Sequence, residues 1–249
     1  MIEIKNLFFS YGKKTIFESL DLVIPESQFV SIIGPNGCGK STLLKLLSND
    51  LDYQRGQIHI EGKAQGDYST GEFSRLLSFN RQDVNGIFPF TCLDYVLMGR
   101  RPYKTHFEDF TKDDLNLVEK FLKMTDTEDF IHASLNEVSG GELQRINLAK
   151  CLVQDTPYLL LDESFSAMDI YHTIKSLNML KGLSDKNIIC VMHDLNLVYQ
   201  YSDHVILLKD GKVYAEGIPK EVLTEDAIKA VYGISMEYIE NKGYIIRGE

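Results

Sequence analysis

The stretch that decides the fold reads Gly34-Pro35-Asn36-Gly37-Cys38-Gly39-Lys40-Ser41. It matches the pattern G-x-x-x-x-G-K-[ST], with an apolar run before it (29–33) and leucines at helical spacing after it. Glycines let successive backbone N–H groups curve around phosphate oxygens, and a helix N-terminus adds partial positive charge. A turn that merely joins a strand to a helix would rarely carry the complete pattern and both flanks. The stretch therefore predicts a phosphate-binding loop in an α/β core.

Two side chains of this loop carry specific expectations. Lys40 would reach the β- and γ-phosphates of a nucleotide, and Ser41 would give its hydroxyl to Mg²⁺. Thr42 follows in the first turn of the expected helix, and we expect it to bind the nucleotide as well. ATP with Mg²⁺ is therefore the expected ligand.

An acidic strand end supplies the second chemical feature. The apolar run 158–161 ends in Asp162 and Glu163. Parallel strands place functional groups at their carboxyl ends, where the phosphate loop also opens. Asp162 can hold Mg²⁺, and Glu163 can polarise an attacking water as a general base. An exposed strand end is the plainer interpretation, but the phosphate loop favours the functional one.

The pattern of apolar residues predicts a β-rich first part, an α-rich middle part, and a last part in which strands and helices alternate. Half-buried or buried strands are expected at 2–4, 20–24, 29–33, 57–61, 158–161, 188–192 and 205–208. Helices are expected at 94–98, 112–124, 142–152 and 225–232. Hairpin turns are expected at Asp210-Gly211 and around residues 241–243. This order predicts an α/β core with an inserted helical lobe.

Composition narrows the function class. The 249 residues carry a formal net charge of −10, which argues against an unspecific nucleic-acid binder. An apolar fraction of 44% excludes a disordered chain. No run approaches the roughly 18 apolar residues of a membrane span, and the N-terminus lacks the pattern of a signal peptide. Four scattered cysteines fit a reducing compartment. A cytosolic protein that does not bind nucleic acid is expected.

A third motif, residues 138–145 (VSGGELQR), resembles the signature sequence of the ATP-binding-cassette (ABC) ATPases, commonly LSGGQ-x-QR. The resemblance covers nearly the whole chain. It implies a two-lobed subunit that dimerises head to tail around two ATP molecules, with Ser139, Gly140 and Gly141 facing the γ-phosphate held by the other subunit. Locally, Ser139 could instead cap a helix with Glu142 at its third position, and both roles are compatible.

Other positions match the family one at a time. Tyr11 resembles the aromatic residue that stacks on adenine, and Gln82 the glutamine that senses Mg²⁺ and water. Asp169 ends a segment (166–169) that resembles the D-loop at the dimer interface. His193 resembles the switch histidine that contacts the γ-phosphate. Taken alone, each would be an ordinary turn or loop residue, and their order along the chain favours the functional interpretation.

The chain departs from the family pattern in three places. Val138 replaces the usual leucine, Glu142 replaces the common glutamine, and Ser164-Phe165 stands where Pro-Thr is frequent. The last change leaves the rigidity of that loop in question. All catalytic positions are filled, so the resemblance implies an active ATPase.

Three function classes compete: the ATPase subunit of an importer, an ABC ATPase outside transport (for example in iron–sulfur cluster assembly), and a nucleotide-regulated binding module. The filled catalytic set argues against the last. Residues 91–103 (TCLDYVLMGRRPY) resemble a segment of the ATPases that serve iron-siderophore, haem and cobalamin importers. Arg100 and Arg101 could serve there as a basic docking patch. The plainer interpretation of residues 99–102 is a loop between helices.

The expected organisation is a single ABC cassette over 1–249. Residues 1–84 and 152–220 would form the nucleotide-binding P-loop NTPase core, with a mainly parallel sheet and an N-terminal antiparallel β subdomain. Residues 85–151 would form the helical signature subdomain, and 221–249 a short C-terminal extension. The expected partners are a second copy, an integral membrane permease and, indirectly, a substrate-binding protein. The expected location is the cytoplasmic side of the cell membrane.

Overall fold

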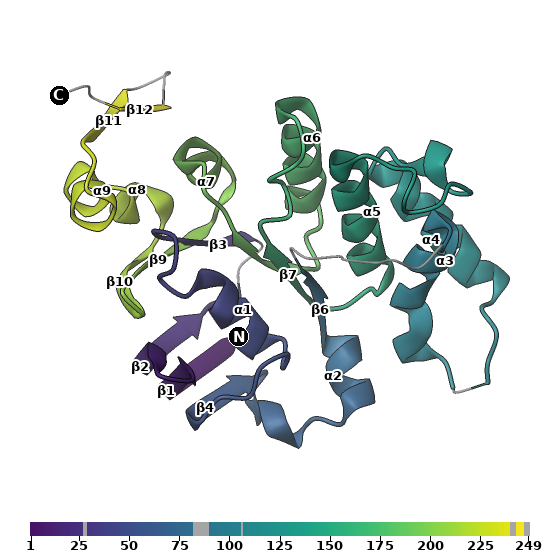
Figure 1. The fold of residues 1–249 in the computed structure, drawn as a ribbon, viewed down its shortest axis with the longest axis horizontal. Coiled ribbons are helices and arrows are strands. Elements are labelled where there is room, and N and C mark those ends of the chain that lie inside the picture. The colour runs from purple at the N-terminus through teal and green to yellow at the C-terminus, as the bar shows by residue number, and fades with distance from the viewer. Residues whose placement is uncertain (27–28, 82–89, 106, 240–242, 247–249) are drawn as a thin grey trace. The chain divides into compact units, whose positions relative to one another are not determined.

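A computed structural model gives the structure of the protein (Figure 1). It describes residues 1–249 except 27–28, 82–89, 106, 240–242 and 247–249. The chain divides into two compact units. Unit 1 combines Met1–Tyr68 with Asn187–Glu249, and unit 2 is the continuous segment Ser69–Lys186.

Unit 1 contains an antiparallel sheet in the order β2-β1-β4-β5. Its strands are β1 (Ile2–Tyr11), β2 (Lys14–Ile24), β4 (Arg55–Ile60) and β5 (Lys63–Ala64). Apolar and polar residues alternate along β1 and β2, so one face of the sheet is buried. The expected strands at 2–4, 20–24 and 57–61 are thereby confirmed.

The second sheet of unit 1 is built around β3 (Phe29–Ile33), which is buried throughout. Its parallel neighbours are β8 (Asn187–Val191) and β9 (His204–Lys209). The antiparallel β10 (Lys212–Gly217) follows β9 through Asp210 and Gly211, whose φ angles are 48° and 72°. Two positive φ angles define the expected two-residue hairpin turn, which is confirmed.

Helix α1 (Lys40–Leu47) follows β3 and buries its leucines. The first segment of unit 1 ends with η1 (Gln65–Asp67). The second segment adds helices and a hairpin: α7 (Leu195–Tyr201), α8 (Pro219–Val222), α9 (Glu225–Tyr232), β11 (Met236–Ile239) and β12 (Gly243–Ile246). The last two strands pair antiparallel, which confirms the C-terminal hairpin, while residues 241–242 of its predicted turn lie outside the described residues. Figure 1 shows this hairpin beyond α9.

Unit 2 contains the parallel strand pair β6 (Leu77–Asn80) and β7 (Tyr158–Asp162). Its helices are α2 (Thr70–Leu76), α3 (Cys92–Leu97), η2 (Met98–Tyr103), α4 (Lys112–Met124), η3 (Glu128–Phe130), α5 (Gly140–Val153) and α6 (Ile170–Lys181). Helix α5 packs against α3 and α4, as Figure 1 shows. The expected helical stretches are confirmed, and α2, α6 and β6 are additional.

A buried ion cluster holds the helices of unit 2 together. Asp114 of α4 accepts a hydrogen bond from Arg100 Nε at 3.1 Å and pairs with Lys104. Burial alone would raise the pKa of Asp114, but hydrogen bonds from Lys104, Thr111 and Arg100 hold it well below its ordinary value. Arg100 also donates to the carbonyl of Val153 at 2.9 Å. The prediction that Arg100 forms part of a docking patch is therefore wrong, because its side chain is 15% exposed and engaged internally.

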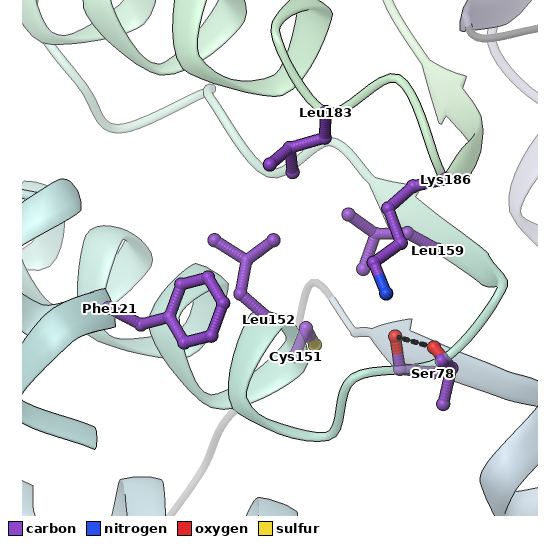
Figure 2. Close-up of a pocket in the computed structure, with 8 residues that line it drawn as sticks. Ser78, Phe121, Cys151, Leu152, Leu159, Leu183 and Lys186 are labelled. Carbon is purple, nitrogen blue, oxygen red and sulfur yellow. Dashed lines mark hydrogen bonds between the residues drawn. The ribbon is translucent and has the colours of Figure 1, made fainter. Parts of the chain in front are cut away.

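A small cavity lies inside unit 2 (Figure 2). Phe121, Leu152, Leu159 and Leu183 supply its apolar wall, and Ser78 lies at its edge, hydrogen-bonded to the Thr156 hydroxyl at 3.0 Å. Its volume of about 20 Å³ has room for roughly one water. The cavity is a packing defect and is far too small for a nucleotide.

No helix among the described residues is both long and apolar enough to cross a lipid bilayer.

Candidate functional site

The phosphate loop joins β3 to α1 in unit 1 and depends on glycine at its first position. Gly34 has φ +147°, and a Cβ there would lie 2.3 Å from the Leu208 carbonyl oxygen of β9. Gly39 has φ +112°, and a Cβ there would lie 2.7 Å from the Phe17 ring of β2. Strands β9 and β2, from two different sheets, therefore lie close against the loop. A side chain at Gly34 or Gly39 would displace it.

Lys40, the first residue of α1, is buried within this loop at 5% exposure. Its Nζ donates to the carbonyl oxygens of Gly34 at 2.8 Å and Pro35 at 3.0 Å. Both of these carbonyl partners are neutral, and no side chain caps the N-terminus of α1. A buried ammonium beside uncapped helix amides fits an anion such as a nucleotide phosphate.

The remaining loop residues line the same turn. Asn36 and Gly37 are exposed, Pro35 is half-buried, and Ser41 and Thr42 are half-buried in the first turn of α1. Cys38 is 6% exposed, and burial raises the pKa of its thiol. A protonated, buried thiol contributes to the loop by packing and through its backbone amide.

His193 follows β8, the parallel neighbour of β3. The amide of Met192 donates to the Ile32 carbonyl at 3.3 Å, and His193 is the exposed residue that comes next. Because β3 and β8 are parallel neighbours, His193 and the phosphate loop emerge at the same edge of the sheet. In unit 1, the structure thus places the predicted switch histidine and the phosphate loop at one edge of the sheet. In the family pattern, both lie next to the γ-phosphate.

Tyr11 ends β1, immediately before the turn that leads into β2. Its ring is 46% exposed and packs edge-on against Phe9, with 4.8 Å between the ring centroids. An exposed, supported aromatic ring is suited to stacking on a base.

Unit 2 carries the acidic strand end. Asp162, the last residue of β7, is 1% exposed. Glu163 follows with φ 48°, a left-handed conformation that is rare for a residue with a side chain. The buried Ser164 hydroxyl accepts a hydrogen bond from Asn80 Nδ2 of β6 at 2.9 Å. This bond anchors the loop at the position where the sequence departs from Pro-Thr.

The signature residues open α5 in unit 2. Ser139 is the N-cap, and its Oγ accepts from the Glu142 amide at 3.4 Å, while the Glu142 carboxylate accepts from the Ser139 amide at 2.6 Å. The capping box considered from the sequence is therefore confirmed. Ser139 and Gly140 are also exposed, so the start of the helix is open to a ligand.

The signature helix is tied to the D-loop segment. Gln144 of α5 accepts from the Ala167 amide at 2.8 Å and donates to the Ser166 hydroxyl at 3.0 Å. A Cβ on Gly141 would lie 3.0 Å from the Ala167 carbonyl oxygen. Asp169 caps α6 by accepting from the His172 amide at 2.8 Å. The two predicted interface motifs thus form one connected surface within unit 2.

Some contacting residues were missed from the sequence. Asn80 positions the acidic loop and lies in a strand that was not expected, while Gln144 binds the D-loop segment from within the signature motif, where the sequence assigns it no separate role. Tyr232 of α9 reaches the phosphate loop: burial raises its pKa to about 12, and a backbone hydrogen bond from Gly34 opposes that shift. The predicted site residue Gln82 lies outside the described residues.

Comparison with known proteins identifies the family. The family model described as "ABC transporter" matches residues 17–166. The chain belongs to this ABC transporter family. The matched span contains the phosphate loop, the signature sequence and the acidic strand end of this ABC protein.

Curated relatives cover most of the chain. The probable siderophore transport system ATP-binding protein YusV of Bacillus subtilis is 35% identical over 96% of this chain and 88% of its own length. The hemin import ATP-binding protein HmuV of Escherichia coli O157:H7 is 34% identical over 97% of this chain and 95% of its own. The ATP-binding cassette MJ0796, solved as a dimer with ADP and Pi, has a TM-score of 0.78 at 28% identity, covering 88% of this chain and 99% of that one.

These findings confirm the resemblance, the P-loop NTPase fold and the assignment as an ABC ATPase. They do not favour the alternative of an ABC ATPase outside transport, since the relatives are named for transport and import.

Proposed function

We propose that this ABC ATPase powers an importer for an iron-siderophore, haem or cobalamin-type substrate through a separate permease. The observation that carries the nucleotide part is the buried Lys40 ammonium, held on backbone carbonyls beside the uncapped start of α1. The names of the relatives, which include a siderophore and a hemin system, support the cargo class.

The phosphate loop is the proposed binding element for ATP. Amides of Gly37, Cys38 and Gly39 surround the phosphates, and Lys40 exchanges its carbonyl partners for phosphate oxygens. Ser41 and Asp162 are the residues that would hold Mg²⁺, together with Gln82. Their hydroxyl, carboxylate and amide oxygens are the ligands this cation prefers, and when bound it would supply positive charge against the phosphate oxygens.

Glu163 is the proposed general base, and His193 the residue that contacts the γ-phosphate. Tyr11 stacks on the adenine. Ser139, Gly140 and Gly141 of a second copy approach the same γ-phosphate, and Asp169 lies at the interface of that homodimer. The dimer of the 28%-identical cassette supports this arrangement. Closing the dimer completes the site, and hydrolysis loosens it, which couples ATP to motion of a partner.

The permease and a substrate-binding protein are the proposed further partners, with the ATPase on the cytoplasmic side of the membrane. Residues 85–151 are the proposed permease-facing helical subdomain, residues 1–84 and 152–220 the nucleotide core, and 221–249 a C-terminal extension. Arg101 is exposed and remains as the basic residue of the proposed docking segment.

Steady-state hydrolysis of Mg-ATP by the purified chain tests the ATPase assignment. We expect Glu163→Gln to bind fluorescent ATP with unchanged affinity and to lose at least about a hundred-fold in turnover, because only the water-polarising carboxylate is removed. Glu216→Gln, on the exposed strand β10, is the matched control and keeps normal turnover. Undiminished hydrolysis by Glu163→Gln would remove Glu163 from the role of base.

A further inference from the structure

The C-terminal hairpin, β11 and β12, packs on α7, the helix that follows His193. Tyr199 of α7 lies 4.8 Å from Tyr238 and 5.8 Å from Tyr244, measured between ring centroids. Tyr238 and Tyr244 lie 5.1 Å apart. The three rings form a tyrosine cluster that joins the end of the chain to the helix behind the proposed switch histidine.

Asn196, in the first turn of α7, binds the backbone of the hairpin. Its Oδ1 accepts from the Tyr244 amide at 2.6 Å, and its Nδ2 donates to the Tyr244 carbonyl at 3.5 Å. The side-chain amide thus takes the place of a neighbouring strand's peptide along β12. Gly243 permits this approach, since it has φ +80° and a Cβ there would lie 2.4 Å from Asn196 Oδ1.

The hairpin is fixed at its other side. Tyr244 is 7% exposed, and its hydroxyl donates to the Leu223 carbonyl, next to α8, at 2.7 Å. Burial raises the pKa of Tyr244 to about 12, so the hydroxyl remains a donor at neutral pH. Asn196 is therefore bound to a strand that is itself hydrogen-bonded to another part of unit 1.

The start of α7 controls the place of His193. Asp194 caps α7 by accepting from the amides of Asn196 at 2.8 Å and Leu197 at 3.2 Å. On the other side, Met192 is hydrogen-bonded to β3. His193 therefore lies between two fixed points. The end of β8 precedes it, and the capped first turn of α7 follows it, where Asn196 is hydrogen-bonded to the hairpin.

We propose that Asn196 and Tyr244 are positioning residues, through which the C-terminal hairpin sets the place of His193 against the γ-phosphate. This inference rests on the proposed function of His193.

A hairpin with only a structural role would affect folding without distinguishing ATP from ADP. A hairpin that acts through His193 affects the γ-phosphate selectively, because ADP lacks the group that His193 contacts. The ratio of ATP to ADP affinity therefore separates the two roles.

The test is a double-mutant cycle on His193 and Asn196. Affinities for fluorescent ATP and ADP are measured in the Glu163→Gln background, where ATP is not consumed. We expect Asn196→Ala to lower the ATP-to-ADP affinity ratio about five-fold, corresponding to one net hydrogen bond. Asn196→Ala combined with His193→Ala should lose no more than His193→Ala alone. In the otherwise unaltered enzyme, KM for ATP should rise about five-fold, because the weakened contact with the γ-phosphate already lowers the affinity for bound ATP.

Two further variants sharpen the test. Tyr244→Phe removes the hydroxyl bond but keeps the backbone bonds to Asn196, so a smaller loss, about two-fold, is expected. Ile245→Ala is the matched control, because this adjacent side chain is 41% exposed and should leave the ratio unchanged.

An unchanged ratio in Asn196→Ala, or losses that multiply in the double variant, would overturn the positioning role. An unchanged ratio in His193→Ala would overturn the proposed role of His193 and the inference with it. The single variants distinguish these failures, and thermal unfolding shows whether each variant is folded.

Discussion

Glu163 holds the backbone in a conformation that residues with side chains avoid. Its φ of 48° costs on the order of 1 kcal/mol or more relative to an extended residue. The neighbours hold it there: Asp162 is buried in β7, and Ser164 is hydrogen-bonded to Asn80. Backbone strain is thus stored at the residue proposed as the general base, where its surroundings over-determine the geometry.

Gly34→Ala tests the close approach of two elements at the phosphate loop. We expect an ATP affinity at least ten-fold weaker and a stability loss of about 3 kcal/mol, because the new Cβ would meet the Leu208 carbonyl. Gly62→Ala is the matched control, since Gly62 also has positive φ, +74°, but nothing lies within 4 Å. It should cost about 1 kcal/mol and keep normal affinity. Nucleotide titration and chemical unfolding measure both effects, and equal losses in the two variants would contradict the steric account.

At the residue scale, the sequence predicts local chemistry well and long-range contacts poorly. The phosphate loop lies in one continuous stretch, so spacing alone identifies it. Asn80 and Ser164 are 84 residues apart, and Asn196 and Tyr244 are 48 apart. A hydrogen bond between distant polar residues leaves no periodic pattern, so nothing in the sequence marks these four residues as partners.

At the element scale, two helices that differ in proposed function begin with the same capping motif. Ser139 with Glu142 opens α5, and Ser69 with Glu72 opens α2, each in a complete capping box. Comparing serine substitutions in the two helices therefore separates the contribution of the cap to stability from its contribution to ligand binding.

Ser139→Ala and Ser69→Ala should each destabilise the protein by about 1 kcal/mol, the usual cost of losing a cap. Only Ser139→Ala should also lower ATP turnover, by roughly ten-fold, because its hydroxyl has a further proposed partner on the other subunit's nucleotide. Unfolding curves and steady-state rates measure the pair. Equal turnover in the two variants would leave Ser139 with a capping role alone.

Elements were predictable where burial follows a simple period. The predicted boundaries of α4 coincide with the observed Lys112–Met124, whose buried face recurs at Asp114, Val118, Phe121 and Leu122. Helix α6 was missed because its buried face is of mixed character: Thr173 and Ser176 are buried beside two leucines, while Ile170 and Tyr171 are more than 60% exposed. Helix α2 was missed because it has no buried residue. Tertiary packing determines α6, whereas α2 begins at the local capping box of Ser69 and Glu72.

At the scale of the whole molecule, the site features are divided between units. Unit 1 carries the phosphate loop, His193 and Tyr11, and unit 2 carries Asp162, Glu163 and the signature helix. Neither unit alone carries every residue of the proposed catalytic set.

The assembly should be visible by size-exclusion chromatography. With Mg-ATP, Glu163→Gln is expected to elute as a dimer, because two nucleotides bridge two copies and are not hydrolysed. Adding Lys40→Ala to the same chain should return it to the monomer position by removing the phosphate contact. A monomer that has demonstrably bound ATP would contradict the head-to-tail arrangement.

The hydrogen bonds of Lys40 have a consequence for selectivity. Its ammonium already has two carbonyl partners at 2.8 and 3.0 Å, so nucleotide binding is an exchange reaction and not the capture of a vacant charge. A hydrogen bond to a charged group contributes about 1.5–3 kcal/mol, and an incoming anion gains only the difference between old and new bonds. A single orthophosphate recovers little from that exchange. A polyphosphate also accepts hydrogen bonds from several loop amides, so it gains much more free energy from the exchange. The loop carbonyls therefore compete with the ligand for Lys40, and this competition disfavours small anions.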